Sequence, residues 1–197
     1  MAIPRLIVLD RDGVINQDSD NYIKSVDEFI PIPGSVEAIA QLCQAGFTVV
    51  VATNQSGIAR KFFSLDTLEA MHQKLQDLLA PLNARIERFY YCPHGPDDQC
   101  ACRKPKPGMM LQIADDFPEL NGSLKNVYVV GDSLRDLEAG RAAGAQVALL
   151  KTGRGMRSLD TIVEENLPGY SQLAVYDDLA DFARQFLASD FLASEKK

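Results

Sequence analysis

The sequence predicts one doubly wound α/β domain, in which a parallel sheet carries helices on both faces. Short apolar runs rich in β-branched residues alternate with amphipathic stretches of helical spacing along most of the 197 residues. The hydrophobicity of these runs is continuous, which indicates strands that are covered on both faces. Polar side chains cluster directly after the runs, where the carboxyl ends of parallel strands hold ligands. The chemistry is therefore expected at that edge of the sheet.

Five apolar runs define the main strands. They cover residues 6–9, 47–52, 89–91, 127–130 and 147–150. A sixth run over 173–176 fits an edge strand, and a helix is expected to follow it over 178–187.

Amphipathic stretches between these runs define the helices. The first begins near Pro33 and is stopped by Gly46. The second starts at Ser64, whose hydroxyl can cap it, and places leucines at helical spacing. A third helix follows Pro107, and a fourth spans residues 134–143.

Composition and charge limit the class of protein. The chain is 46% hydrophobic and 24% charged, as in ordinary globular domains. Its net charge of −7 argues against a nucleic-acid partner, which requires clustered Lys and Arg. No apolar run approaches the ~20 residues of a membrane span, and Asp10 comes too early for a secretory signal. We therefore expect a cytoplasmic monomer with one domain over residues 1–188 and a flexible tail over 189–197.

Charged or small polar residues follow four of the expected strands. Asp10 and Asp12 end the first strand and lie on the same side of extended chain, ~7 Å apart at their Cα atoms. The second strand is followed by Thr53-Asn54-Gln55-Ser56-Gly57, which can hold a phosphate. The third group is Arg103-Lys104-Pro105-Lys106. The last group is Gly131-Asp132-Ser133 with Asp136, which can complete a Mg²⁺ site with Asp10. Each alone also fits a solvated loop or a capping turn, but their joint occurrence favours a catalytic site.

The order D-R-D-G, T-N, K and G-D-x-x-x-D resembles the four motifs of the haloacid dehalogenase (HAD) superfamily of phosphohydrolases over about residues 5–152. Several longer stretches resemble, more narrowly, the family of D-glycero-D-manno-heptose 1,7-bisphosphate 7-phosphatases. These stretches are residues 9–13, 22–25, 32–35, 53–60, 92–94 and 102–105. Lys61 and Ser133 depart from the family pattern, which has glycine at the first position and, in some members, lysine at the second.

This resemblance implies a phosphohydrolase mechanism and assigns residues to it. Asp10 would be the nucleophile and Asp12 the general acid. Mg²⁺ would be held by Asp10, Asp132 and the backbone carbonyl of Asp12, and Asp136 would orient Lys104 or a metal-bound water. Thr53, Asn54 and Lys104 would hold the phosphoryl oxygens. Substrate contacts would come from Arg11, Asp18, Tyr22, Gln55, Ser56, Arg60, Ser133 and Arg103, the last reading the phosphate that is not cleaved.

Three cysteines and a histidine predict a second metal site. Cys92-x-His94 and Cys100-x-Cys102 supply a complete ligand set for tetrahedral structural Zn²⁺. Free buried thiols and a redox pair are the alternatives. Because Cys102 directly precedes Arg103 and Lys104, zinc would fix these two cations at the mouth of the site.

The function implied by the resemblance is Mg²⁺-dependent removal of the C7 phosphate from a sugar bisphosphate, in the synthesis of ADP-heptose for the lipopolysaccharide core. A histidinol-phosphate phosphatase is the nearest alternative, followed by a nucleic-acid 3′-end phosphatase and a non-catalytic binding module. Three other features fit ordinary structural roles. Cys43 is expected in the core, His72 at the surface or satisfied, and Phe62-Phe63 in packing or in closing over substrate.

Overall fold

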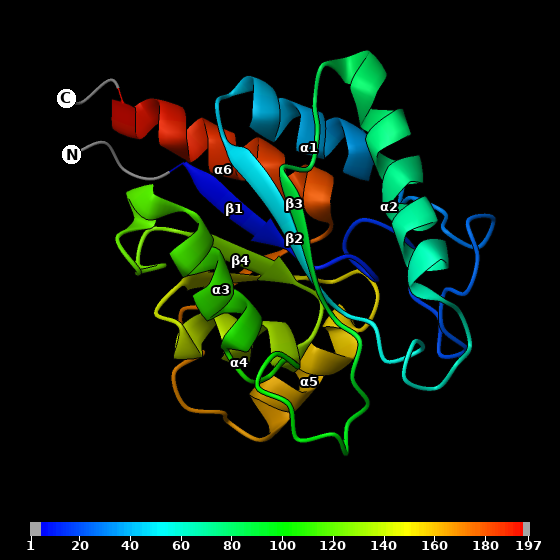
Figure 1. Cartoon of the computed structure of the whole chain (residues 1–197). Coiled ribbons are helices and arrows are strands. Elements are labelled where there is room, and N and C mark those ends of the chain that lie inside the picture. The colour runs from blue at the N-terminus through cyan, green and yellow to red at the C-terminus, as the bar shows by residue number, and fades with distance from the viewer. Residues whose placement is uncertain (1–4, 195–197) are drawn as a thin grey trace.

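A six-stranded, all-parallel sheet forms the centre of the protein in the computed structural model, which describes residues 5–194 (Figure 1). The strand order is β3-β2-β1-β4-β5-β6, so the order reverses at β1. The predicted fold class is confirmed. The strands are β1 (Leu6–Leu9), β2 (Thr48–Asn54), β3 (Arg88–Cys92), β4 (Tyr128–Gly131), β5 (Gln146–Leu150) and β6 (Ala174–Tyr176).

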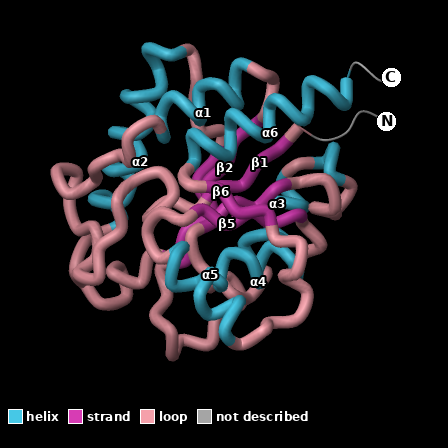
Figure 2. The backbone as a smooth tube through the Cα atoms, turned by 180° about the vertical axis from the view of Figure 1, so that it is seen from behind, coloured by secondary structure: helices cyan, strands magenta, loops and turns pink. Residues whose placement is uncertain are grey.

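Helices cover both faces because alternate residues of each strand enter different cores. Ile7 and Leu9 face the cluster that includes α1, α2 and α6, whereas Leu6 and Val8 face the cluster that includes α3 and α4. Figure 2 shows the same two layers from behind, with the sheet between them. The helices are α1 (Ser35–Gln44), α2 (Leu65–Leu79), α3 (Gly108–Asp116), α4 (Leu134–Ala142), α5 (Gly155–Glu164) and α6 (Leu179–Ser194).

The ends of two helices follow the capping residues of the sequence. Ser64 Oγ accepts a hydrogen bond from Thr67 N at 3.1 Å and caps α2, as predicted. Gly144, with φ 79°, follows the last turn of α4, a left-handed position that favours glycine.

The C-terminal third differs from the sequence expectation at two places. Helix α5 was not predicted, although Leu159 and Ile162 give it an apolar face against Leu149. Helix α6 continues to Ser194, so residues 189–194, which were assigned to a flexible tail, are helical. Residues 195–197 of that tail lie outside the described part of the chain.

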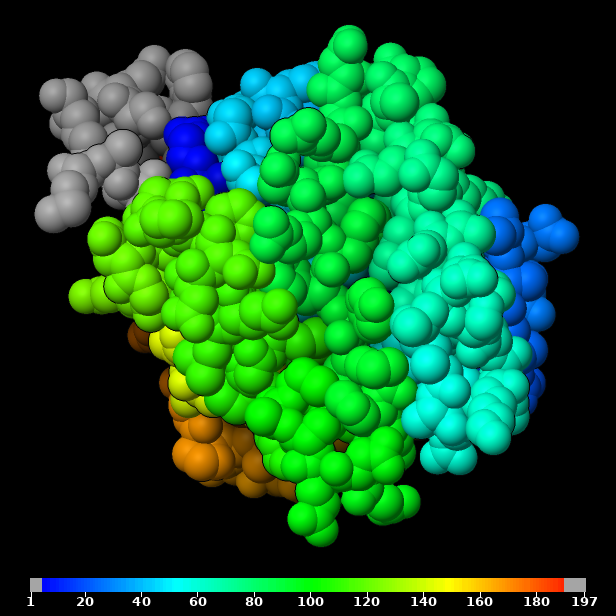
Figure 3. Space-filling view, in the orientation of Figure 1, coloured from blue at the N-terminus to red at the C-terminus, as the bar shows by residue number. Residues whose placement is uncertain are grey.

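The first strand is the most deeply enclosed element of the sheet. All four of its residues are buried, and segments from about residue 60 to 120 hide it in the space-filling view (Figure 3). The loops after β1, β2 and β3 leave the sheet on the same side in Figure 1. Together with the loops after β4 and β5 they surround a cavity of about 290 Å³.

Within residues 5–194, no helix combines the length and apolar character needed to cross a bilayer. The expectations of a cytoplasmic location, a monomer and no nucleic-acid partner stay predictions.

Candidate active site

The carboxyl end of β1 places Asp10 at the base of the cavity. Asp10 N donates to Val130 O at 2.9 Å, which fixes the backbone between β1 and β4. Its carboxylate oxygen Oδ1 accepts hydrogen bonds from Arg11 N at 2.7 Å and from Lys104 Nζ at 2.9 Å. These contacts occupy Oδ1 and leave Oδ2 without a protein partner among the described residues.

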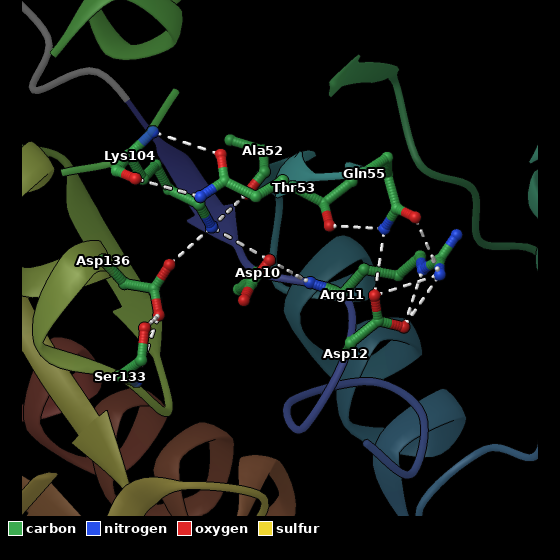
Figure 4. A network of polar contacts seen from close by, with 10 residues as sticks. Asp10, Arg11, Asp12, Ala52, Thr53, Gln55, Lys104, Ser133 and Asp136 are labelled. Carbon is green, nitrogen blue, oxygen red and sulfur yellow. Dashed lines mark hydrogen bonds and ion pairs between the residues drawn. The ribbon is translucent and has the colours of Figure 1, made fainter. Parts of the chain in front are cut away.

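Lys104 brings one buried cation to the carboxylates (Figure 4). Its side chain is 3% exposed, and Nζ donates to Ala52 O at 2.7 Å besides its ion pair with Asp10. Asp136 forms a second, short ion pair with the same ammonium. Asp136 also accepts from Ser133 N at 3.0 Å and Ser133 Oγ at 2.6 Å, which caps α4 and fixes the carboxylate toward Lys104.

Asp132 completes the acidic group from the end of β4. Its Oδ2 accepts from Arg154 N at 2.7 Å, in the loop after β5. A Cβ atom on either Gly13 or Gly153 would lie 2.1 Å from this oxygen, and both residues have positive φ. Glycine is therefore required on both sides, because the two backbones form a close cradle around the carboxylate.

Asp10, Asp132 and Asp136 form a candidate metal centre, since their oxygens lie within 4.8 Å of one another. Burial, with the charges of Asp136 and Asp12, outweighs Lys104 and raises the pKa of Asp10 to about 7. Burial raises the pKa of Asp132 to about 8, with further contributions from the charges of Asp136 and Asp10. Burial alone would lower the pKa of Lys104, but Asp10 and Asp136 raise it, so the ammonium stays charged. One ammonium does not balance three carboxylates, and the oxygen donors suit Mg²⁺.

Asp12 points to a different set of partners from those of Asp10. Arg11 donates to it from Nε at 3.0 Å and from Nη2 at 2.8 Å, and Asn16 Nδ2 donates at 2.8 Å. Gln55 Nε2 donates to the other oxygen at 2.9 Å. Burial raises the pKa of Asp12, but the Arg11 charge and these hydrogen bonds outweigh burial and lower it.

Arg11 and Gln55 were expected to bind substrate, and in the structure both contact Asp12. Arg11 is fully buried and does not line the cavity, because its guanidinium lies against Asp12 and the ring of Phe29. Gln55 lines the cavity, but its amide is engaged by Asp12, Arg11 and Thr53 Oγ1. Both residues therefore hold the expected general acid.

Asn54, an expected phosphate contact, lines the cavity and holds the backbone of Lys104. Its Oδ1 accepts from Lys104 N at 3.1 Å and its Nδ2 donates to Lys104 O at 3.0 Å. Both ends of the amide are thus used to hold the Lys104 backbone against β2. Thr53 keeps a hydroxyl at the cavity wall, where it accepts from Gln55 Nε2 at 2.9 Å.

The other predicted substrate residues line the cavity, as do two arginines that the sequence reasoning missed. The predicted ones are Asp18, Tyr22, Ser56, Arg60, Arg103 and Ser133. The missed ones are Arg135, in the first turn of α4, and Arg154, which pairs with Asp18 at 2.9 Å. Their position in the sequence could have identified them, since both arginines follow the carboxyl end of a strand.

Phe62 and Phe63, for which packing and closing over substrate were both open, lie in different surroundings. Phe62 is half exposed and contacts Tyr22, with ring centroids 5.1 Å apart. Phe63 is buried against Gly57 and has a packing role.

The four predicted zinc ligands converge into one cluster beside Arg103. Donor atoms of Cys92, His94, Cys100 and Cys102 lie within 4.8 Å of one another, with His94 contributing Nδ1. Cys92 Sγ lies 3.6 Å from Cys100 Sγ and 3.2 Å from Cys102 Sγ, far beyond the ~2.05 Å of a disulfide bond. Three sulfurs and one imidazole nitrogen at this spacing fit a tetrahedral Zn²⁺.

Comparisons with known proteins identify chains that are similar to this one. A family model described as HAD-hydrolase-like matches residues 101–182. A D-glycero-β-D-manno-heptose-1,7-bisphosphate 7-phosphatase of Pseudomonas putida is 54% identical over 93% of this chain and 99% of its own. The crystal structure of the D,D-heptose 1,7-bisphosphate phosphatase of Bordetella bronchiseptica, complexed with magnesium and phosphate, superposes with a TM-score of 0.86. It is 49% identical and covers 94% of this chain and 99% of that one.

The fold, the acidic site and these matches define a phosphatase of the HAD hydrolase class. A second solved structure, the heptose bisphosphate phosphatase of Burkholderia thailandensis, is 43% identical with a TM-score of 0.70, covering 93% of this chain and 98% of its own. The chain belongs to the family of D-glycero-β-D-manno-heptose-1,7-bisphosphate 7-phosphatases. The resemblance predicted from the motifs is thereby confirmed.

Proposed function

We propose that the protein removes the C7 phosphate of D-glycero-β-D-manno-heptose 1,7-bisphosphate, in the synthesis of ADP-heptose for the lipopolysaccharide core. The observation that carries this proposal is the buried Asp10–Lys104–Asp136 ion-pair group beside Asp132, at the base of a cavity whose mouth is lined by arginines. A nucleophilic carboxylate, a fixed cation and distal arginines are what a doubly phosphorylated substrate requires.

In the first step, Asp10 Oδ2 attacks phosphorus while Oδ1 stays bonded to Lys104 and Arg11 N. The new O–P bond forms an aspartyl phosphate, and the bond from phosphorus to the sugar oxygen breaks. Asp12 donates a proton to the leaving oxygen. In the free enzyme Arg11 favours ionised Asp12, and the approach of an anionic phosphate raises its pKa, because two nearby negative charges disfavour each other.

In the second step, water attacks the phosphoryl group and Asp12 removes its proton. The bond between phosphorus and Asp10 Oδ2 then breaks, which regenerates the carboxylate and releases phosphate. The charge of Lys104, fixed beside Asp10, stabilises the transferring group throughout, and Thr53 Oγ1 offers a donor at the cavity wall.

Mg²⁺ fits the candidate metal centre, where Asp10, Asp132 and the backbone carbonyl of Asp12 would hold it. When bound, it neutralises phosphate charge as the transferring group approaches. Asp136 acts on Lys104 through their ion pair and is left out of the ligand set.

Zn²⁺ fits the cluster of Cys92, His94, Cys100 and Cys102 in a structural role, because four protein ligands leave no open position. Arg103 Nη1 donates to His94 O at 3.2 Å, so the same loop that would bind zinc orients Arg103. We infer that Arg103 contacts the phosphate that is not cleaved.

Phosphate release tests this proposal directly. The purified protein with Mg²⁺ is incubated with the heptose bisphosphate, histidinol phosphate and a 3′-phosphorylated oligonucleotide, with Asp10→Asn as the inactive control. We expect the highest kcat/KM on the bisphosphate. Faster turnover of either other substrate would contradict the assignment, and equal release by Asp10→Asn would indicate a contaminating phosphatase.

A further inference from the structure

Arg154 lines the active-site cavity, but its guanidinium is bound to two carboxylates. Its Nε donates to Asp18 Oδ2 at 2.9 Å, and its Nη2 donates to Asp20 Oδ1 at 3.3 Å. The side chain of Asp18 is 21% exposed and that of Asp20 is 91% exposed, so the bond to Asp18 is the more sheltered of the two. The mechanism described above gives this ion-pair group no task.

The backbone around Arg154 is held by separate contacts. Arg154 N donates to Asp132 Oδ2 at 2.7 Å, and Thr152 Oγ1 donates to Gly13 O at 2.6 Å. A Cβ atom on Gly153 would lie 2.7 Å from Gly13 Cα, so the two backbones are in close contact. None of these contacts uses the side chain of Arg154. The backbone is therefore a fixed anchor from which the guanidinium reaches residues 18–20.

Residues 18–23, which we call the wall segment, form one side of the active-site cavity. Asp18, Ser19, Asp20, Tyr22 and Ile23 all line it. Asp18 Oδ1 accepts from Ser19 N at 2.8 Å, and Tyr22 N donates to Ser19 O at 3.0 Å. One oxygen of Asp18 thus orders the wall segment from within, while the other oxygen binds Arg154.

The ion-pair group also separates two cavities. Asp18, Ser19, Asp20 and Arg154 line both the active-site cavity of about 290 Å³ and a neighbouring cavity of about 520 Å³. Without the ion pairs, the wall segment has space to move into the second cavity and away from the substrate. The position of the wall therefore depends on Arg154.

We propose that Arg154 is a positioning residue for substrate binding, which fixes the wall segment through Asp18 and Asp20. While one phosphate of a sugar bisphosphate reacts at Asp10, the sugar extends along the cavity walls, whereas a small phosphate compound stays at the base. An exposed ion pair contributes little to overall stability, so its loss should affect substrate binding more than folding. This inference rests on the proposed function, because it takes the heptose bisphosphate as the substrate.

Arg154→Gln tests the proposal, since it removes the charge but keeps the backbone N–H that binds Asp132. Arg157→Gln is the matched control, because Arg157 is an exposed arginine that lines only the second of the two cavities. Steady-state kinetics with Mg²⁺ are compared on the heptose bisphosphate and on acetyl phosphate. A background of Asp18→Ala shows whether Arg154 acts through its carboxylate partner.

Arg154→Gln should raise KM for the bisphosphate roughly five-fold, the scale of one partly exposed ion pair, and leave kcat within about two-fold. Both constants for acetyl phosphate, and the Mg²⁺ concentration for half-maximal activity, should stay within about two-fold of wild type. Arg157→Gln should match wild type on both substrates. In the Asp18→Ala background, Arg154→Gln should raise KM less than about two-fold further.

Hydrogen exchange of the free protein gives a second measurement that needs no substrate. In Arg154→Gln the amides of Ser19 and Tyr22 should exchange faster, while the strands exchange as in wild type. Unchanged exchange at these amides, or faster exchange throughout the chain, would overturn the proposal.

Three kinetic results would also overturn it. These are an unchanged KM for the bisphosphate, an equal loss on acetyl phosphate, and a full five-fold effect in the Asp18→Ala background, which would indicate that Arg154 contacts the substrate directly. Failure of the proposed function is recognised separately, because wild type itself would then not cleave the heptose bisphosphate. Hydrogen exchange would in that case still decide whether Arg154 fixes the wall segment.

Discussion

Asp132→Asn should stabilise the metal-free protein while abolishing its response to magnesium. Asp132 lies beside Asp10 and Asp136, whose negative charges disfavour its ionised form. Asparagine is nearly the same shape, and its Oδ1 can still accept the hydrogen bond from Arg154 N. The substitution therefore removes charge with little loss of contact.

The pKa of Asp132 sets the size of the effect. It rises from 3.8 to about 8, which at ~1.4 kcal/mol per pKa unit makes the ionised form cost on the order of 5 kcal/mol in the folded state. A carboxyl group with a raised pKa binds its proton more tightly when folded, so metal-free wild type loses stability as pH rises from about 4 to 8. Because Asp10 titrates together with Asp132, we expect a gain of at least about 2 kcal/mol at pH 8. For this chain length that gain corresponds to an increase in Tm of roughly 4–8 °C.

Thermal unfolding in EDTA at pH 5 and pH 8 measures this gain. The matched control is Asp160→Asn, which removes an exposed carboxylate from α5 and should leave Tm unchanged. The advantage of Asp132→Asn should shrink at pH 5, where wild-type Asp132 is protonated. Saturating Mg²⁺ should raise the Tm of wild type but not that of the variant. A variant less stable than wild type in EDTA at pH 8 would refute the electrostatic reasoning.

Three further outcomes follow from the site. Asp12→Asn should keep magnesium binding, measured by titration calorimetry, but retain less than a tenth of wild-type kcat, a loss above roughly 1.4 kcal/mol; a higher kcat would contradict its acid–base role. Elemental analysis of protein purified without added metal should find about one zinc per chain, and fully active, reduced, zinc-free protein would oppose the structural site. Cys100→Ser should leave the circular dichroism spectrum of the sheet and helices intact. It should raise KM for the bisphosphate more than KM for a monophosphate ester. Global unfolding, or equal changes in the two KM values, would show that the loop does not act through Arg103.

The convergence of Asp10, Lys104 and Asp132 could be predicted from the sequence because it depends on topology. Parallel strands end at one edge of the sheet, so polar residues after consecutive apolar runs meet there. The cysteine cluster could be predicted because its ligands are close in sequence and suit only a few chemistries. Neither prediction requires knowledge of side-chain orientation.

The tasks of Asn54, Gln55 and Arg11 could not be predicted, because they depend on orientation. A short amide after a strand reaches either a bound phosphate or a neighbouring backbone, and a small change in direction decides between them. In the structure, Asn54 turns to the backbone of Lys104 and Gln55 turns to Asp12. His72 was misjudged for a related reason, since its burial depends on how α2 packs against β3, where its ring stacks on Phe89.

The charges of the site favour an order of binding. When Asp10 and Asp132 ionise, the three carboxylates outweigh the single ammonium of Lys104, and the negative base of the cavity repels a phosphate dianion until a divalent cation neutralises it. The positive charges that attract the substrate lie instead on Arg60, Arg103 and Arg135, whereas Arg154 is paired with Asp18 and Asp20. A metal ion should therefore enter before the substrate, and the arginines should hold the distal phosphate while the other reaches Asp10. The folded chain keeps the carboxylates close despite their mutual repulsion, because Asn54 fixes Lys104 and two glycines enclose Asp132. The site is therefore organised for a cation before any ligand arrives.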